Sequence, residues 1–447
     1  MTNPPSTALM TDEYELTMIR AALASGTAFR HSVFELFARR LPPGRRYGVV
    51  AGVGRALEAV ANFRFGDEEL TFLRKNAIID DPTAEYLSSF RFTGSIWGYG
   101  EGDLYFPGSP LVSVRGTFAE CVVLETILLS IYNYDSAVAS AASRMTLMAE
   151  DRPCIEMGSR RINEWAAVAA ARAAYIAGFA STSNMEAGRT YGIPTSGTAA
   201  HSFTLLHDTE EEAFRAQIAT LGEDTTLLVD TYDIEAAVRT GVRITNGQLG
   251  AVRIDSGDLT ATAREVRALL DDLGATKTRI IVTSDLDEWQ LAALAGAPVN
   301  GYGVGTSLVT GSGAPTCSMV YKLVARATSD APDAPLVPVA KKSAAKVSVG
   351  GQKYAVRRLD VKGIAEAELI GVNAPPQGDG DDRPLLRELI RDGEIVGDEP
   401  LSQARKRHNA ARGELPRDGY KMSRGEPVIP TYYLDDEGAI MPSPYGG

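Results

Sequence analysis

One stretch of the chain, IPTSGTAAHSF at 193–203, surrounds a histidine with small and hydroxyl-bearing residues. His201 is one of four histidines in 447 residues. Because small side chains leave the backbone accessible, a large ligand can approach the imidazole and Thr198 together. The alternative is a structural histidine whose ring bonds a neighbouring carbonyl.

The densest group of charged residues is VRIDSGDL at 252–259. In an alternating strand, Arg253 and Asp255 point to the same face, and Gly257 permits a tight turn before Asp258. A cation beside two carboxylates can orient a ribose diol and hold Mg²⁺ on a polyphosphate. The alternative is an Arg–Asp pair that braces the structure, with Asp258 capping the next helix.

Two further segments suit anionic or aromatic ligands. GVGTSLVTGSG at 303–313 offers the backbone of Gly305 and the hydroxyls of Thr306 and Ser307, which suit a phosphate, although glycine-rich turns are common. GSRR at 158–161 places Arg160 and Arg161 beside a small-residue turn. A guanidinium there can clamp a phosphate or stack on an aromatic ring, whereas one of the two can equally be a surface charge.

Each of these groups follows a short apolar stretch that alternates with a helical pattern. This rhythm predicts parallel strands joined by right-handed crossovers, and hence an α/β fold with an irregular β/α barrel. A doubly wound open sheet is the competing architecture, but no Gly-x-Gly-x-x-Gly follows the first strand. The expected strands lie within 155–161, 178–184, 194–201, 225–233, 250–258, 278–288 and 300–310, with 319–325 as a candidate eighth.

In a β/α barrel the carboxyl ends of the strands form the active site. The polar side chains at these ends are therefore expected to converge on one face. They are Arg160, Arg161, Ser183, Asn184, Thr198, His201, Asp230, Asp233, Arg253, Asp255, Asp258, Ser284, Asp285, Thr306 and Ser307.

The remaining sequence predicts two flanking regions. Residues 1–125 mix helical and strand patterns and are expected to form an N-terminal α/β domain, followed by the catalytic barrel at 126–335. Residues 336–447 are expected to form a C-terminal hairpin and an irregular extension that packs across the other two domains. The hairpin, at 337–358, would turn at Gly350-Gly351.

Composition excludes several classes of partner. A net charge of −12 argues against a general nucleic-acid surface or an anionic membrane surface. The most apolar helical stretches contain Glu120, Glu125 and Arg172, which argues against a membrane span. The three cysteines are far apart and no CxxC occurs, so we expect a reducing, cytoplasmic location without a zinc site or disulfide framework.

The motifs TDEYELTM (11–18), GSRR, GTAAHSF, VRIDSGDL and GVGTSLVT occur in this order. In this combination the chain resembles nicotinate phosphoribosyltransferases, from about Thr11 to the C-terminal tail. The resemblance implies synthesis of nicotinate mononucleotide and pyrophosphate from nicotinate and 5-phosphoribosyl 1-pyrophosphate (PRPP), coupled to ATP hydrolysis, for NAD synthesis. It also implies Mg²⁺ as cofactor and a homodimer whose active sites lie at the subunit interface.

The resemblance also implies roles at matching positions. His201 matches the histidine that ATP phosphorylates transiently, and Asp255 the residue that holds the ribose. Arg160 would stack near the pyridine ring. Ser183 stands where nicotinamide-using relatives place an aspartate, and its lack of charge favours nicotinate. The implied nicotinate contacts are Tyr14, Thr198, Arg253, Arg160 and Ser183; the implied PRPP contacts are Thr306, Asp255, Gly305 and Ser307; and the implied metal ligands are Asp255 and Asp258.

Two positions depart from the family pattern. Asn163 replaces a histidine expected shortly after the paired arginines, and Gly350-Gly351 replaces an expected Pro-Gly turn. The alternatives are a nicotinamide or quinolinate phosphoribosyltransferase on the same fold, another sugar-phosphate enzyme, or a non-catalytic nucleotide-binding barrel. Retention of the charged strand ends disfavours the last.

Overall fold

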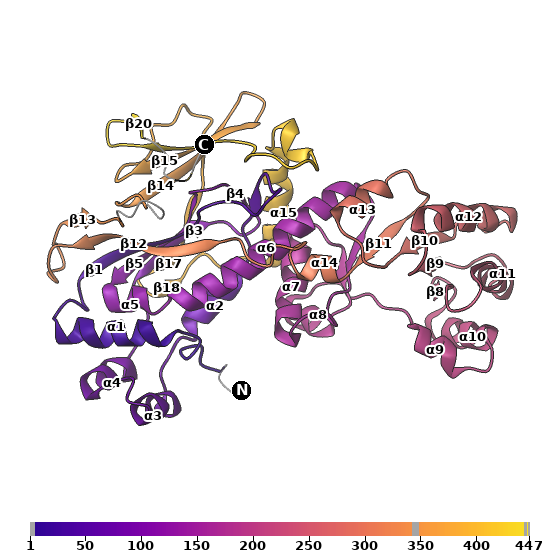
Figure 1. The fold of residues 1–447 in the computed structure, drawn as a ribbon, viewed down its shortest axis with the longest axis horizontal. Coiled ribbons are helices and arrows are strands. Elements are labelled where there is room, and N and C mark those ends of the chain that lie inside the picture. The colour runs from indigo at the N-terminus through magenta and orange to yellow at the C-terminus, as the bar shows by residue number, and fades with distance from the viewer. Residues whose placement is uncertain (1–4, 342–347, 442–444, 446–447) are drawn as a thin grey trace. The chain divides into compact units, whose positions relative to one another are not determined.

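The computed structural model describes residues 5–341, 348–441 and 445 (Figure 1). The chain forms two compact units, one built from residues 1–137 and 316–447 and the other from residues 138–315. We call them the discontinuous unit and the half-barrel unit. The α/β fold class is confirmed, and the parallel strands of the half-barrel unit form one irregular sheet rather than a closed ring across the described residues.

The half-barrel unit contains a six-stranded parallel sheet in the order β7-β6-β11-β10-β9-β8. The 194–201 segment contributes only a single parallel bridge, between Thr182 and Thr195. The strands are apolar and largely buried, as expected when helices cover a parallel sheet. The strands are β6 (Cys154–Glu156), β7 (Ser181–Thr182), β8 (Thr226–Leu228), β9 (Ala251–Ile254), β10 (Arg279–Val282) and β11 (Gly301–Val304).

The helices that follow these strands begin at polar caps. Side chains of Asn163, Asn184, Asp233, Asp258 and Asp287 accept hydrogen bonds from the first turns of their helices, which fixes where each connection ends. The helices are α7 (Glu164–Ile176), α8 (Met185–Tyr191), α9 (His201–Leu206), α10 (Glu210–Leu221), α11 (Ile234–Ile244), α12 (Leu259–Asp272), α13 (Glu288–Ala293) and α14 (Thr306–Val309).

The discontinuous unit is organised around a seven-stranded sheet in the order β13-β12-β1-β5-β3-β17-β18. Its core includes a stacked pair, Phe34 and Tyr321, with ring centroids 5.0 Å apart. The strands are β1 (His31–Ala38), β3 (Ser95–Tyr99), β5 (Pro110–Thr117), β12 (Met319–Ala327), β13 (Leu336–Pro338), β17 (Leu386–Arg391) and β18 (Glu394–Ile395); the helices are α1 (Glu13–Ala24), α2 (Val53–Ala61), α3 (Asp67–Lys75), α4 (Asp81–Ser88) and α5 (Phe118–Val122).

A second, five-stranded sheet in the order β16-β14-β15-β19-β20 completes this unit. A short two-stranded ladder joins β2 to β4. The elements are β2 (Gly48–Val49), β4 (Leu104–Tyr105), β14 (Lys353–Leu359), β15 (Ala365–Val372), β16 (Arg383–Pro384), β19 (Thr431–Leu434), β20 (Ile440–Met441), α15 (Leu401–Gly413) and the 3-10 helix η1 (Arg417–Tyr420).

Two further strand assignments differ from the sequence-based expectation. The candidate eighth barrel strand, β12, pairs antiparallel with β1, because its alternating burial suits a sheet with one apolar face. The expected 337–358 hairpin is also wrong: β13 pairs with β12, and β14 pairs with β15. Residues 342–347 of that stretch lie outside the described residues.

The boundaries between the two compact units therefore differ from the expected domain boundaries. Residues 316–335, expected with the barrel, lie in the discontinuous unit through the β1–β12 pairing. Residues 336–447 share that unit with the N-terminal segment, since β17 pairs with β3. The helix α6 (Glu125–Ala149) includes residues of both units.

One helical stretch, Phe118–Ala149, is long and apolar enough to cross a membrane by length and composition alone. In its most apolar window 67% of the residues are buried inside the protein.

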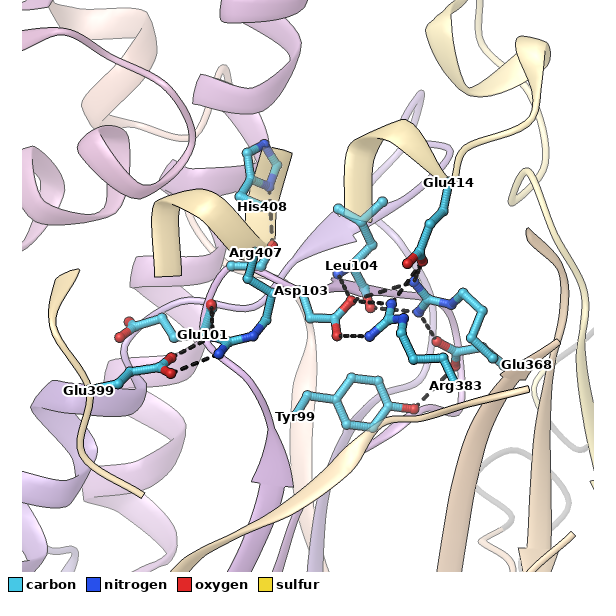
Figure 2. Close-up of polar contacts among 12 residues, drawn as sticks. Tyr99, Glu101, Asp103, Leu104, Glu368, Arg383, Glu399, Arg407, His408 and Glu414 are labelled. Atoms are coloured by element: carbon cyan, nitrogen blue, oxygen red, sulfur yellow. Dashed lines mark hydrogen bonds and ion pairs between the residues drawn. The ribbon is translucent and has the colours of Figure 1, made fainter. Parts of the chain in front are cut away.

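A buried network of charged groups joins the C-terminal segment of the discontinuous unit to its N-terminal segment (Figure 2). Arg357, on β14, is 1% exposed, binds Glu368 on β15 and donates to the Leu104 carbonyl at 2.8 Å. Arg383 bridges Asp103 and Glu414 at 2.7 and 2.8 Å. Because each buried carboxylate faces a guanidinium, the desolvation of these charges is offset by pairing and hydrogen bonds.

His408 lies on α15 close to this network. It is 1% exposed, and its Nδ1 lies 3.2 Å from the Gly102 carbonyl. Burial lowers the pKa of His408 from 6.5 to about 4, because the charged ring loses its hydration. The folded protein therefore holds this imidazole neutral at neutral pH.

We expect the free energy of unfolding to decrease in acid because of His408. The depressed folded pKa means that the unfolded chain binds a proton between about pH 6.5 and pH 4 while the folded chain does not. Stability is present above that window and is lost as pH falls through it, by about 2 kcal/mol between pH 7 and pH 5.

Denaturant unfolding of the wild type and of His408→Asn at both pH values measures this difference. Asparagine keeps a donor toward the Gly102 carbonyl but does not titrate, so the variant's loss between pH 7 and pH 5 is expected to be smaller by that amount. His207→Asn is the control. An unchanged pH dependence in His408→Asn would contradict the assignment.

Candidate active site

A polar pocket of about 280 Å³ lies at the carboxyl ends of the parallel strands in the half-barrel unit. Four strands, β6, β9, β10 and β11, supply its walls through residues near their carboxyl ends and in the loops that follow. This is where a parallel α/β sheet places its ligands. The lining residues are Met157, Arg160, Arg161, Arg253, Asp255, Thr283, Ser284, Asp285, Gly303, Gly305 and Thr306.

Arg253 is held by the 193–203 stretch. Its guanidinium donates to the Thr198 hydroxyl at 3.3 Å and to the Ala199 carbonyl at 3.1 Å. Its Nε has no hydrogen-bond partner among the described residues. Burial lowers the pKa of Arg253, and the Asp255 and Asp230 carboxylates partly offset that shift. The arginine is thus positioned in the pocket with donor capacity left for a ligand.

Asp255 is fixed by residues that follow both strands neighbouring β9, namely β10 and β8. The Thr283 hydroxyl donates to Asp255 Oδ1 at 2.5 Å, and the Asp255 backbone N–H donates to the Asp230 carboxylate at 2.9 Å. A carboxylate oriented in this way can accept hydrogen bonds from ligand hydroxyls.

His201 is the first residue of α9 and lies beside two residues that follow β8. Its Nδ1 is 3.0 Å from the Thr231 hydroxyl, and its Nε2 is 3.9 Å from Asp230 Oδ1. The His201 side chain is 41% exposed, whereas Asp230 is 2% exposed. Sequence reasoning placed Asp230 at a strand end without a role, but its carboxylate contacts the loops of both His201 and Asp255.

Other expected site residues have different surroundings. The Asp258 carboxylate accepts hydrogen bonds from the backbone of Thr260 and Ala261 at 3.1 and 3.0 Å, and so caps α12. Ser183 is exposed and donates its backbone N–H to the Glu156 carbonyl at 2.8 Å. Ser307 lies within α14, and neither serine is among the residues that line the pocket.

Tyr14 belongs to the discontinuous unit, on α1, with 45% of its surface exposed. Partial burial and the neighbouring Glu125 carboxylate raise the pKa of Tyr14 to about 12. Its phenol is therefore protonated at neutral pH and can donate a hydrogen bond.

Sequence reasoning missed two features of the pocket. Thr283, buried at the end of β10, was not a candidate, although its hydroxyl holds Asp255. Ser284 adopts a φ of +130°, a conformation rare for residues other than glycine. Its carbonyl accepts a hydrogen bond from Leu286 at 2.8 Å, which closes a tight turn at the pocket wall. No sequence signal indicates this conformation.

The pocket supplies only some of the ligands that a Mg²⁺ ion needs. Among the described residues there is no group of three or more His, Cys, Asp or Glu side chains able to hold a metal ion. Asp255 lines the pocket, whereas Asp258 caps a helix. One carboxylate fits an ion that takes its remaining ligands from water and substrate phosphates, which is how Mg²⁺ is commonly bound.

Comparison with known proteins decides the family. Residues 9–133 match the model of the nicotinate phosphoribosyltransferase (NAPRTase) N-terminal domain. A nicotinate phosphoribosyltransferase of Mycobacterium tuberculosis is 54% identical over 438 residues, covering 96% of each chain. The chain belongs to the nicotinate phosphoribosyltransferase family. The resemblance inferred from the five motifs is confirmed.

Two further relatives support the same family. A nicotinate phosphoribosyltransferase of Bacillus subtilis is 36% identical over 330 residues, covering 72% of this chain and 67% of that protein. The crystal structure of human nicotinic acid phosphoribosyltransferase superimposes with a TM-score of 0.82 at 25% identity, covering 96% of this chain and 98% of that one. The fold is thus shared along almost the whole chain.

We expect the paired arginines of the pocket to bind a polyanion. Replacing both Arg160 and Arg161 by glutamine should weaken the binding of inorganic pyrophosphate about tenfold or more, because charge-assisted hydrogen bonds to phosphate are lost. Isothermal titration measures the affinity. The control Arg239→Gln, on the exposed side of α11, should leave it unchanged. If the control loses as much affinity for pyrophosphate as the double variant, the anion binds elsewhere.

Proposed function

We propose that this chain is a nicotinate phosphoribosyltransferase that forms nicotinate mononucleotide and pyrophosphate from nicotinate and PRPP, in NAD biosynthesis. The observation that carries the proposal is the single pocket in which Arg253, Asp255 and Thr306 meet. It occurs in a chain that is 54% identical to an enzyme of that name along nearly its full length.

The reaction requires positioning more than proton transfer. The pyridine nitrogen forms a bond to the anomeric carbon of PRPP while the bond from that carbon to the pyrophosphate oxygen breaks, and no proton moves. Positive charge develops on the ribose ring and negative charge on the leaving group. The Asp255 carboxylate stabilises the ribose side, and Arg161 stabilises the pyrophosphate side.

The nicotinate end of the pocket follows from the contacts of Arg253. Its guanidinium and the Thr198 hydroxyl lie 3.3 Å apart and form a pair that can bind the nicotinate carboxylate. Arg160 would stack on the pyridine ring, and Tyr14 is proposed to complete the site. Ser183 stands where nicotinamide-using relatives place an aspartate, so that particular repulsion of the nicotinate carboxylate is absent.

Thr306, with Gly305 and Ser307, is proposed to bind the 5-phosphate of PRPP. Asp255 is the residue that would hold Mg²⁺, with Asp258 as the second proposed ligand. When bound, the ion would neutralise charge on the departing pyrophosphate.

The ATP coupling is proposed to act through His201. If the ring proton is on Nδ1, this N–H donates a hydrogen bond to the Thr231 hydroxyl. Nε2 then keeps a lone pair and is the nucleophile. Nε2 then takes the γ-phosphoryl group of ATP as the bond to ADP breaks. The contact between Nδ1 and the Thr231 hydroxyl, at 3.0 Å, then sets the orientation of the ring. Hydrolysis of the phosphohistidine later releases phosphate.

The proposal includes a cytoplasmic homodimer with shared active sites. The family resemblance is the support for the dimer, and the three free, buried cysteines agree with a reducing compartment. The competing functions are transfer to nicotinamide or quinolinate on the same fold and nucleotide binding without catalysis.

The deciding experiment is a product assay with PRPP, Mg²⁺ and each of nicotinate, nicotinamide and quinolinate, with and without ATP. We expect the mononucleotide chiefly from nicotinate, and more of it with ATP. Preference for nicotinamide or quinolinate would make this a sister enzyme. Absence of product from all three would leave the binding function.

His201→Asn is expected to remove the stimulation by ATP while keeping some ATP-independent turnover, because the phosphoryl acceptor is lost but the pocket is retained. Labelling with γ-³²P-ATP should mark the wild type and His207→Asn but not His201→Asn. If ATP stimulates His201→Asn as strongly as the wild type, the phosphohistidine is not at this position.

A further inference from the structure

Glu156, the last residue of β6, is a buried carboxylate to which neither the motifs nor the proposed mechanism gives a role. It is fully buried, and it ends the strand that leads to the loop with Arg160 and Arg161. Burial raises the pKa of Glu156, and only the hydrogen bonds from Thr182 and Gly158 act against that shift. A carboxylate in such a place is costly, so its contacts are worth following.

The two oxygens of Glu156 bind two different loops. The Gly158 backbone N–H donates to Oε1, which holds the start of the loop between β6 and α7. The Thr182 hydroxyl donates to Oε2 at 2.5 Å, from the end of the neighbouring strand β7. One carboxylate therefore joins the loop that carries Arg160 to the loop that carries Ser183.

The connection continues beyond Thr182. The same hydroxyl accepts a hydrogen bond from the Asn184 backbone N–H at 2.9 Å. The Asn184 side-chain amide then donates to the Ser159 hydroxyl at 3.0 Å, which returns to the first loop. Glu156, Thr182, Asn184 and Ser159 thus form a closed polar network between the two loops, which we call the Glu156 network.

A steric constraint fixes the first loop from its other side. A Cβ atom added at Gly158 would lie 2.1 Å from Cγ1 of Val309, so the loop packs closely against α14. Since α14 begins at Thr306, the pocket residues Arg160 and Thr306 belong to segments in direct contact.

We propose that Glu156 is a positioning residue for phosphoribosyl transfer: through the Glu156 network it holds the β6–α7 and β7–α8 loops in the arrangement that places Arg160 and Arg161 in the pocket. The inference rests on the proposed function, and Glu156 itself does not line the pocket. Glu156 acts by setting the positions of the side chains that bind substrate.

Three variants test this role. Glu156→Gln keeps the shape but replaces one acceptor oxygen by an amide donor, and Thr182→Val keeps the shape but removes the hydroxyl. Each is expected to lower kcat/KM for PRPP about tenfold, mainly through kcat, and Glu156→Ala about a hundredfold. The double variant Glu156→Gln/Thr182→Val should lose about as much as one single variant, because both interrupt one network.

Thr278→Val is the matched control. Thr278 is also a buried threonine of the half-barrel unit, and its hydroxyl donates to the Leu249 carbonyl at 2.8 Å. It directly precedes β10, at the amino end of the strands and so at the opposite edge from the pocket. A comparable change in thermal unfolding with unchanged kcat/KM is expected for this variant.

Hydrogen exchange of peptides covering 157–163 and 183–191 gives a readout that does not depend on activity. Exchange should quicken at both loops in Glu156→Gln and Thr182→Val, but not in Thr278→Val. The proposal is overturned if the loops exchange as in the wild type, if the losses of the two single variants multiply in the double variant, or if Thr278→Val loses as much kcat/KM. An inactive wild type would instead overturn the proposed function, and the exchange data alone would then show whether Glu156 joins the loops.

Discussion

The register between β9 and β10 is the constraint on which the pocket depends. Ile254 lies opposite Val282, and the Thr283 N–H donates to the Ile254 carbonyl at 2.9 Å. The residues that follow, Asp255 and Thr283, are consequently adjacent, and their side chains bond to each other. In a parallel sheet every strand ends at the same edge, so a one-residue slip would turn Asp255 away from the pocket. Backbone pairing thus sets the chemistry.

Two buried carboxylates are compensated in different ways. In the discontinuous unit, Arg357 and Glu368 face each other in the interior. Arg357 also donates to the Leu104 carbonyl, which joins β14 and β15 to β4. In the half-barrel unit, Glu156 has no cation among the causes of its pKa shift, and its donors among the described residues are the neutral Gly158 N–H and Thr182 hydroxyl. The first arrangement compensates charge with charge, whereas the second uses a carboxylate to connect loops.

The sequence was informative where local chemistry determines structure. Apolar runs that end in polar residues located the strand ends, and Arg253 and Asp255 were found from one alternating motif. The partner of a strand is not encoded locally, which is why β12 was assigned to the barrel although it pairs with β1. The Asp258 carboxylate caps a helix, which is the alternative role that the sequence allowed for it. The φ of Ser284 and the connections of Glu156 arise from tertiary contacts and have no periodic signal.

The discontinuous unit also sets an order of events during synthesis. The half-barrel strands all lie within one continuous segment, 138–315, so they can pair as soon as that segment has emerged from the ribosome. The interior strand β1, in contrast, waits for β12, and Glu35 on β1 binds Lys353 across 318 residues. Until then, an apolar strand has an unpaired edge. The earliest strand of this sheet in chain order is therefore among the last to be paired on both edges.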